Sequence, residues 1–232
     1  DNSKQRQHYH ALLGAGYRLA PLFGSDIHEN TFKGTMADGE RGDSYRRLMR
    51  FFANYLLVPA GKLLLPSDLA TALKQGRGFS VFEVMGQPQG FDFSAEKQDG
   101  SRAELGDTVD RGAKLTVRAP QPLPVGYATR EVVETLRLYF VPAGGAEAEV
   151  VAEQKFTAEE LQQGAGLSFD TSLRGAGAYR VEARLTPRHL LHLLGDESTR
   201  YDKEYPYLFS GSIFVGNIAR HGGRCQSVTL PP

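Results

Sequence analysis

The 232-residue chain has a single cysteine and no net charge. With Cys225 alone, no disulfide can form within the chain. Lys and Arg number 27, as do Asp and Glu, so the formal net charge of +0 gives no electrostatic reason to bind nucleic acid or an anionic membrane. No uncharged apolar stretch approaches the ~20 residues that span a bilayer. We therefore expect neither a nucleic-acid partner nor a transmembrane segment.

Residues 1–90 alternate between helix-like and strand-like patterns. Tyr9, Leu12 and Leu13 share one face of a predicted opening helix, and an extended segment at 17–23 follows it. The order helix, short strand, polar turn is that of one αβ unit in a layered or barrel fold. The glycine-containing stretch 29–43 is predicted to be a long loop, and such loops are often functional.

Two further segments precede residue 91. Apolar residues recur at helical spacing from Tyr45 to Leu56, although the run 51–58 could instead be a buried strand. Ser67 is predicted to cap the start of a second helix, which Gly76 ends, with a strand after it.

From about residue 91 the pattern changes to short β-like runs separated by Gly, Pro and Asp. Leu115 and Val117 alternate with polar neighbours, as do Leu136 and Leu138. Short strands at such spacing are typical of a β-sandwich. The predicted strands are 91–96, 114–118, 134–141, 149–156, 179–185 and 208–215, with a helical insert at 187–194.

Asp26 and His28 are the sharpest candidates for chemistry. Residues two apart at the end of an extended segment point to the same side. A carboxylate beside an imidazole suits zinc, manganese or iron. From spacing alone, a turn-forming Asp and an exposed His remain the alternative.

Three segments resemble the metal-dependent phosphoesterases of the PHP (polymerase and histidinol phosphatase) family. Residues 9–28 are similar to the last metal-binding segment of that family, 68–79 to a later helix-to-strand segment, and 82–91 to the turn that leads into a trailing β-domain. The resemblance implies that Asp26 and His28 help to hold a cluster of divalent metal ions (Zn, Mn or Fe). Such a cluster polarises a small phosphate-ester substrate and generates hydroxide as the nucleophile.

The resemblance also implies an α+β fold. Residues 1–90 would form the carboxyl-terminal αβ units of a PHP-type distorted β/α barrel, and residues 91–232 an Ig-like β-sandwich. The family's opening His-x-His strand and its other metal ligands have no counterpart in this chain. We therefore expect a companion polypeptide that carries those ligands. Because the chain begins at Asp1, we also expect a cleavage product or a cloned fragment.

Five other residues are candidates for substrate binding. A guanidinium matches the geometry of phosphate, and residues that follow the metal ligands could reach metal or substrate. A solvated surface role is the alternative for each. These candidates are Arg18, Glu29, Asn30, Arg41 and Arg50. His189 and His192 could share one face of a short helix, but packing is the favoured interpretation of both.

Two functions follow from these patterns. The first is the distal part of a metal-dependent phosphoesterase, active only with its missing part. The alternative is a non-catalytic module that binds a protein or glycan. The trailing β-sandwich and the near absence of cysteine favour an exported bacterial protein.

The first function predicts that Asp26→Ala or His28→Ala lowers the metal content of the complete assembly without unfolding it, because each change removes one ligand. Elemental analysis of the purified assembly measures this. Metal stoichiometry that is unchanged in both variants contradicts the assignment.

Overall fold

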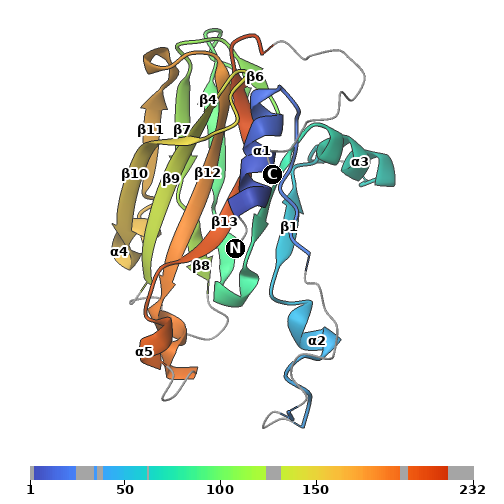
Figure 1. Cartoon of the computed structure of the whole chain (residues 1–232), viewed down its shortest axis with the longest axis vertical. Coiled ribbons are helices and arrows are strands. Elements are labelled where there is room, and N and C mark those ends of the chain that lie inside the picture. The colour runs from blue at the N-terminus through green and yellow to red at the C-terminus, as the bar shows by residue number, and fades with distance from the viewer. Residues whose placement is uncertain are drawn as a thin grey trace.

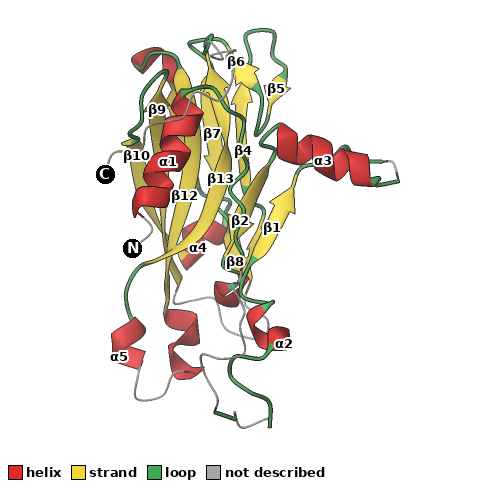
Figure 2. Cartoon of the chain, turned by 45° about the vertical axis from the view of Figure 1, so that its right-hand side comes forward, coloured by secondary structure: helices red, strands yellow, loops and turns green. Residues whose placement is uncertain are grey.

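The computed structural model describes residues 3–24, 34–35, 39–61, 63–123, 132–193 and 198–218. In this part of the chain, two antiparallel sheets lie face to face, and helix α1 (Ser3–Gly14) lies across the outer face of the larger one (Figures 1 and 2). None of the described helices is long and apolar enough to cross a membrane.

The larger sheet contains seven strands within the described residues. All neighbours are antiparallel except β6, which runs parallel to the end of β13. The order is β1 (Ala53–Leu56), β2 (Gly78–Val81), β13 (Tyr205–Val215), β12 (Gly177–Pro187), β9 (Val132–Pro142) and β10 (Glu149–Thr157), with β6 (Thr108–Val109) beside β13.

The smaller sheet and a separate ribbon complete the strands that the structure describes. The smaller sheet has the order β11 (Gly166–Asp170), β7 (Lys114–Arg118), β4 (Asp92–Glu96) and β5 (Arg102–Ala103), and the ribbon pairs β3 (Gln87–Gln89) with β8 (Gln121–Leu123). Short helices connect the strands: α2 (Tyr45–Leu48), α3 (Pro66–Lys74), η1 (Glu83–Met85), α4 (Ala158–Gln162), η3 (Thr171–Leu173), η4 (Arg188–Leu193) and α5 (Ser198–Tyr201).

One apolar core fills the space between the two sheets. Leu115 and Val117 of β7 are buried between exposed neighbours, and Leu136 and Leu138 of β9 reach the same core from the facing sheet. This alternation is the physical basis of both strands, because successive side chains of a strand point to opposite faces. The strands predicted from alternation at 114–118 and 134–141 are therefore confirmed.

The predicted fold class is wrong. Residues 1–90 do not form αβ units of a barrel, because β1 and β2 are adjacent antiparallel strands and β2 continues the same sheet by pairing with β13. A β/α barrel requires parallel strands. The stacked rings of Tyr55 and Phe79, 4.8 Å apart at an interplanar angle of 3°, form a cross-strand pair that fixes the β1–β2 register. The molecule is mainly β, with two antiparallel sheets and no barrel among the described residues.

Local predictions in residues 1–90 had mixed outcomes. The opening helix is confirmed as α1, whereas 17–23 has no ladder partner and is held by side chains, with Asn54 accepting from the Phe23 amide at 2.9 Å and donating to its carbonyl at 3.0 Å. Only Tyr45–Leu48 of the expected 45–56 helix is helical, and the strand alternative is correct for β1. Helix α3 begins at Pro66, where Asp68 rather than Ser67 caps the start by accepting from the Leu65 amide at 3.0 Å.

Glu134 of β9 departs from the apolar pattern of the core. Its side chain shares the face of Leu136, is fully buried, and neither carboxylate oxygen has a hydrogen-bond partner. The nearby Tyr207 hydroxyl donates instead to the Gly86 carbonyl at 3.0 Å. Burial raises the pKa of Glu134 well above its usual value of 4.5, so the folded protein holds this group as the neutral acid.

We predict that the stability of the protein falls as pH rises above about 4.5, because the unfolded chain then releases the Glu134 proton while the folded chain keeps it. Glu134→Leu removes this slope and raises the free energy of unfolding near neutral pH by about 1–3 kcal/mol. Urea unfolding between about pH 5 and pH 8 measures both effects. Parallel pH profiles of wild type and variant would contradict the prediction.

Candidate functional site

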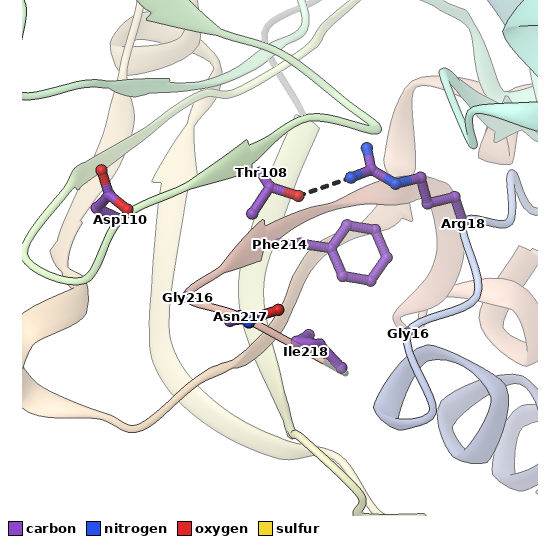
Figure 3. A pocket seen from close by; sticks show the side chains of 8 residues that line it. All are labelled: Gly16, Arg18, Thr108, Asp110, Phe214, Gly216, Asn217 and Ile218. Carbon is purple, nitrogen blue, oxygen red and sulfur yellow. Dashed lines mark hydrogen bonds between the residues drawn. The ribbon is translucent and has the colours of Figure 1, made fainter. Parts of the chain in front are cut away.

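A cleft of about 480 Å³ lies where the end of α1, β6 and the end of β13 meet. Figure 3 shows the guanidinium of Arg18 on one side, the carboxylate of Asp110 on the other, and the ring of Phe214 between them. The lining residues are Gly16, Arg18, Thr108, Asp110, Phe214, Gly216, Asn217 and Ile218.

The end of α1 places Arg18 in the cleft. Gly16 has a φ of 82°, and the amides of Gly16 and Tyr17 donate to Leu13 and Leu12 at 2.9 and 3.0 Å. This pair of bonds is a Schellman motif, which ends a helix at a residue of positive φ. The chain therefore reverses at Gly16 and directs Arg18 towards β6.

Arg18 fastens the end of α1 to the loop that precedes β6. Its guanidinium donates to the Gly106 carbonyl and, at 2.7 Å, to the Thr108 hydroxyl, and it lies 5.4 Å from the centre of the Phe214 ring. Gly106 is required at its position: its φ is +86°, and a Cβ would lie 2.1 Å from the Gln75 carbonyl oxygen.

Backbone hydrogen bonds hold the same loop against β13. The Gly106 amide donates to the Ser212 carbonyl at 2.8 Å, and the Phe214 amide donates to the Asp107 carbonyl at 2.9 Å. On the other side of the loop, an Arg77 guanidinium nitrogen lies 2.6 Å from an Asp107 carboxylate oxygen. The wall of the cleft is therefore fixed before any ligand binds.

The cleft combines charges of both signs with apolar surface. Asp110 and Asn217 are exposed, Phe214 is 4% exposed, and Ile218 is half-buried. Among the lining residues that the structure describes, Arg18 brings one positive charge and Asp110 one negative charge, so their charges balance. The Thr108 hydroxyl accepts from Arg18, and no two of the described lining side chains pair a nucleophile with a base.

Four of the sequence-predicted site residues, Asp26, His28, Glu29 and Asn30, lie outside the described residues. The metal site and its companion polypeptide therefore stay predictions. Within the described ranges, no group of three or more His, Cys, Asp or Glu side chains could hold a metal ion.

The structure does not bring the three predicted arginines together. Arg18 lines the cleft, whereas Arg41 and Arg50 flank α2 at the opposite end of the molecule from β6 (Figure 1). Arg41 makes a bidentate contact with Asp43, at 2.9 and 3.0 Å, and Arg50 is exposed. A phosphate site made jointly by these side chains is thus excluded.

Two of the described histidines, His10 and His189, serve packing. His189 is buried, with Nε2 2.9 Å from the Met85 carbonyl oxygen, as its packing interpretation expects. His10 lies 3.1 Å from the Arg180 guanidinium on the outer face of the large sheet. Burial, aided by Arg180, lowers the pKa of His10 to about 4, so it stays neutral at physiological pH.

A buried ion network continues along this outer face. Arg180 and Glu182 are almost fully buried, and Arg184 joins Glu182 at 2.7 Å to Glu204 at 2.6 Å. The guanidinium of Arg180 also lies 4.3 Å from the centre of the Tyr139 ring. These charges compensate one another, and Arg180 joins the network to His10 of α1.

Comparisons with known proteins do not assign the chain to a family. No family model matches it, and no curated protein matches it. Among solved structures, the soluble domain of PmoD from Methylocystis sp. ATCC 49242 (Rockwell) has 18% sequence identity and a TM-score of 0.30, over 54% of this chain and 90% of that domain. A TM-score this low gives no basis for transferring fold or function.

The PHP assignment is therefore wrong. The segments 68–79 and 82–91, which carried part of that resemblance, form α3, β2, η1 and β3 of a mainly antiparallel β structure. The order of short motifs along a chain does not distinguish a strand in a parallel barrel from one in an antiparallel sheet.

Asp110, Phe214 and Asn217 escaped the sequence analysis. Asp110 is about a hundred positions from the other two, and the parallel pairing of β6 with the end of β13 brings the two segments together. No local signal marks such a pairing. The glycines at 106 and 216 were the nearest available hint.

We predict that Arg18→Met lowers the free energy of unfolding by about 1–3 kcal/mol, because two hydrogen bonds from a charged donor are lost. Urea unfolding measures the change, and Arg50→Met serves as the matched control at an exposed site. Equal effects of the two substitutions would show that Arg18 does not fasten the loop.

Proposed function

We propose that the chain is a non-catalytic binding module whose cleft at Arg18, Asp110 and Phe214 takes a small, uncharged ligand rich in hydroxyl groups, such as a saccharide. The observation that carries this proposal is the balance of one cation and one anion among the described residues of the cleft, whose other side chains supply a hydroxyl, an amide and apolar surface.

The balanced charge supports a neutral ligand. An anion would be attracted by Arg18 and repelled by Asp110, whereas a cation would be repelled by Arg18 and attracted by Asp110. Neither kind of ion therefore gains net electrostatic attraction to these two side chains. A hydroxyl group can donate to the Asp110 carboxylate and can both accept from and donate to the Asn217 amide. A polyol therefore uses both side chains without bringing a charge into the cleft.

The size and the apolar part of the cleft agree with such a ligand. A volume of about 480 Å³ lies within the range of small-molecule sites. Phe214 and Ile218 supply apolar surface for the carbon skeleton, although the nearly buried Phe214 ring forms the floor rather than a stacking platform.

The metal-dependent hydrolysis of phosphate esters remains a separate proposal. It rests on Asp26 and His28 and on a companion chain, and no described residue supports it. An exported location also remains a proposal.

We predict that ¹⁵N-labelled protein titrated with a panel of mono- and disaccharides shows amide shifts at Thr108, Gly216 and Asn217 for at least one sugar. Asp110→Asn weakens that binding at least about tenfold, because a hydrogen bond to a charged acceptor is lost. Glu159→Gln, an equivalent change on α4 at the far end of the molecule, leaves the affinity unchanged.

The outcome separates the cleft from adventitious contacts. Shifts spread over the surface, or equal affinities of the Asp110 and Glu159 variants, would overturn the proposal. Binding that is limited to charged sugars would overturn its claim of a neutral ligand.

A further inference from the structure

Helix α1 is held on the outer face of the large sheet by a small apolar contact (Figure 2). Its Leu13 side chain is fully buried and packs against Val141, Ala178 and Phe214. Every side chain from Lys4 to Leu12 is exposed or half-buried. Because the free energy of an apolar contact grows with the area buried, α1 is docked less firmly than the two sheets are held together.

The face beneath α1 is charged as well as apolar. Arg180 of β12 is 2% exposed there, and its Nε donates a hydrogen bond to Nε2 of His10 at 3.1 Å. The His10 ring also lies near the Tyr139 ring, with centroids 6.4 Å apart and an interplanar angle of 28°. Water would hydrate the guanidinium if the helix left, which lowers the cost of uncovering this face.

The hydrogen bond from Arg180 sets a condition on the protonation of His10. A guanidinium has only donors, so Nε2 of the ring must offer it a lone pair. A proton on Nε2 would bring one N–H group against another and would place a second positive charge beside Arg180. Helix α1 therefore keeps this contact only while His10 is neutral.

The groups around His10 do not offset that added charge. Arg6 and Arg180 both disfavour a proton on the ring. Glu182, the carboxylate beside Arg180, is already joined to Arg184 at 2.7 Å. The titratable and charged groups that the structure places around the ring are Arg6 and Tyr9 of α1, Arg180 and Glu182 of β12, and Tyr139 of β9.

We propose that α1 is a pH-sensitive switch, which stays docked on the large sheet while His10 is neutral and leaves the sheet when His10 is protonated in acid. The bend at Gly16, with its φ of 82°, lies between the helix and Arg18. Arg18 donates to the Gly106 carbonyl and the Thr108 hydroxyl beyond that bend. The helix can therefore move while the chain after it stays fastened.

Release of α1 also reaches the cleft. It uncovers Phe214, which packs against Leu13 and lines the cleft. The cleft is then open on the side of α1. The effect of this opening on ligand affinity rests on the proposed function, whereas the switch itself does not.

The pH range of the switch follows from the two positions of His10. The undocked ring titrates near its ordinary pKa of 6.5, whereas burial and Arg180 lower the pKa of the docked ring to about 4. The undocked state therefore binds more protons between these two values. The ratio of docked to undocked helix falls about tenfold for each unit by which the pH decreases through this range, and it is constant below it.

The test follows the contact between the Leu13 methyl groups and the Phe214 ring by nuclear Overhauser effects in the full chain, from about pH 7.5 to about pH 3.5. We expect the contact to disappear as the His10 ring becomes protonated. His10→Gln keeps the contact at every pH, because the amide oxygen accepts from Arg180 without titrating. His10→Lys loses it even at neutral pH, while the amide signals of β9 and β12 in the core show that the sheets remain folded.

His8→Gln is the matched control, because His8 is exposed on the same helix. Behaviour of this variant like that of the wild type supports the proposal. Loss of the contact in acid to the same extent in His10→Gln would overturn it, since titration of other groups would then release the helix. A contact that persists at the lowest pH in the wild type, or at neutral pH in His10→Lys, would overturn it as well.

Discussion

The structure depends on the register between β12 and β9, two neighbouring eleven-residue strands inside the large sheet. Their pairing runs without interruption from Gly177 opposite Pro142 to Pro187 opposite Val132. A slip by one residue would turn Val181 to the outer face and bring Arg180 and Glu182 into the apolar core. The cost of burying those charges away from their partners fixes the register, and with it both faces of the sheet.

Each face then receives a different layer. The inner face packs against the small sheet through the apolar core. The outer face receives α1, where Leu13 packs on Val141, Ala178 and Phe214 while Arg180 meets His10. Because α1 is held at this position, its end delivers Arg18 to β6. The cleft is thus a consequence of the same register.

The large sheet also has a polar side chain at a core-facing position, where an apolar one is expected. Glu134 occupies a core-facing position of β9, with Leu185 and Phe156 opposite it on the neighbouring strands and Leu136 two residues along. The fold tolerates it as a neutral acid. Buried polar groups without partners are rare in folded proteins, so this carboxyl is a cost that the rest of the core offsets.

The sequence by itself determined the local structure wherever a pattern was complete. Alternation in β7 and β9 predicted strands, and the glycines after α1 and α3 marked where those helices end. Composition correctly described a neutral chain without disulfides. The sequence also indicated Arg18 as a substrate-binding residue. In the structure, its guanidinium instead donates hydrogen bonds to the Gly106 carbonyl and the Thr108 hydroxyl.

The tertiary structure alone decided which segments meet. The PHP resemblance failed because the order of motifs in a sequence does not determine whether the strands pair in parallel or antiparallel. In the structure, β1 and β2 are antiparallel strands at one edge of the large sheet. Likewise, Asp110 and Asn217 face one cleft only because β6 pairs with the end of β13. A local sequence pattern depends only on residues that are close together in the chain. Pairing between distant strands is fixed by the core that they bury together, and that core exists only once the chain has folded.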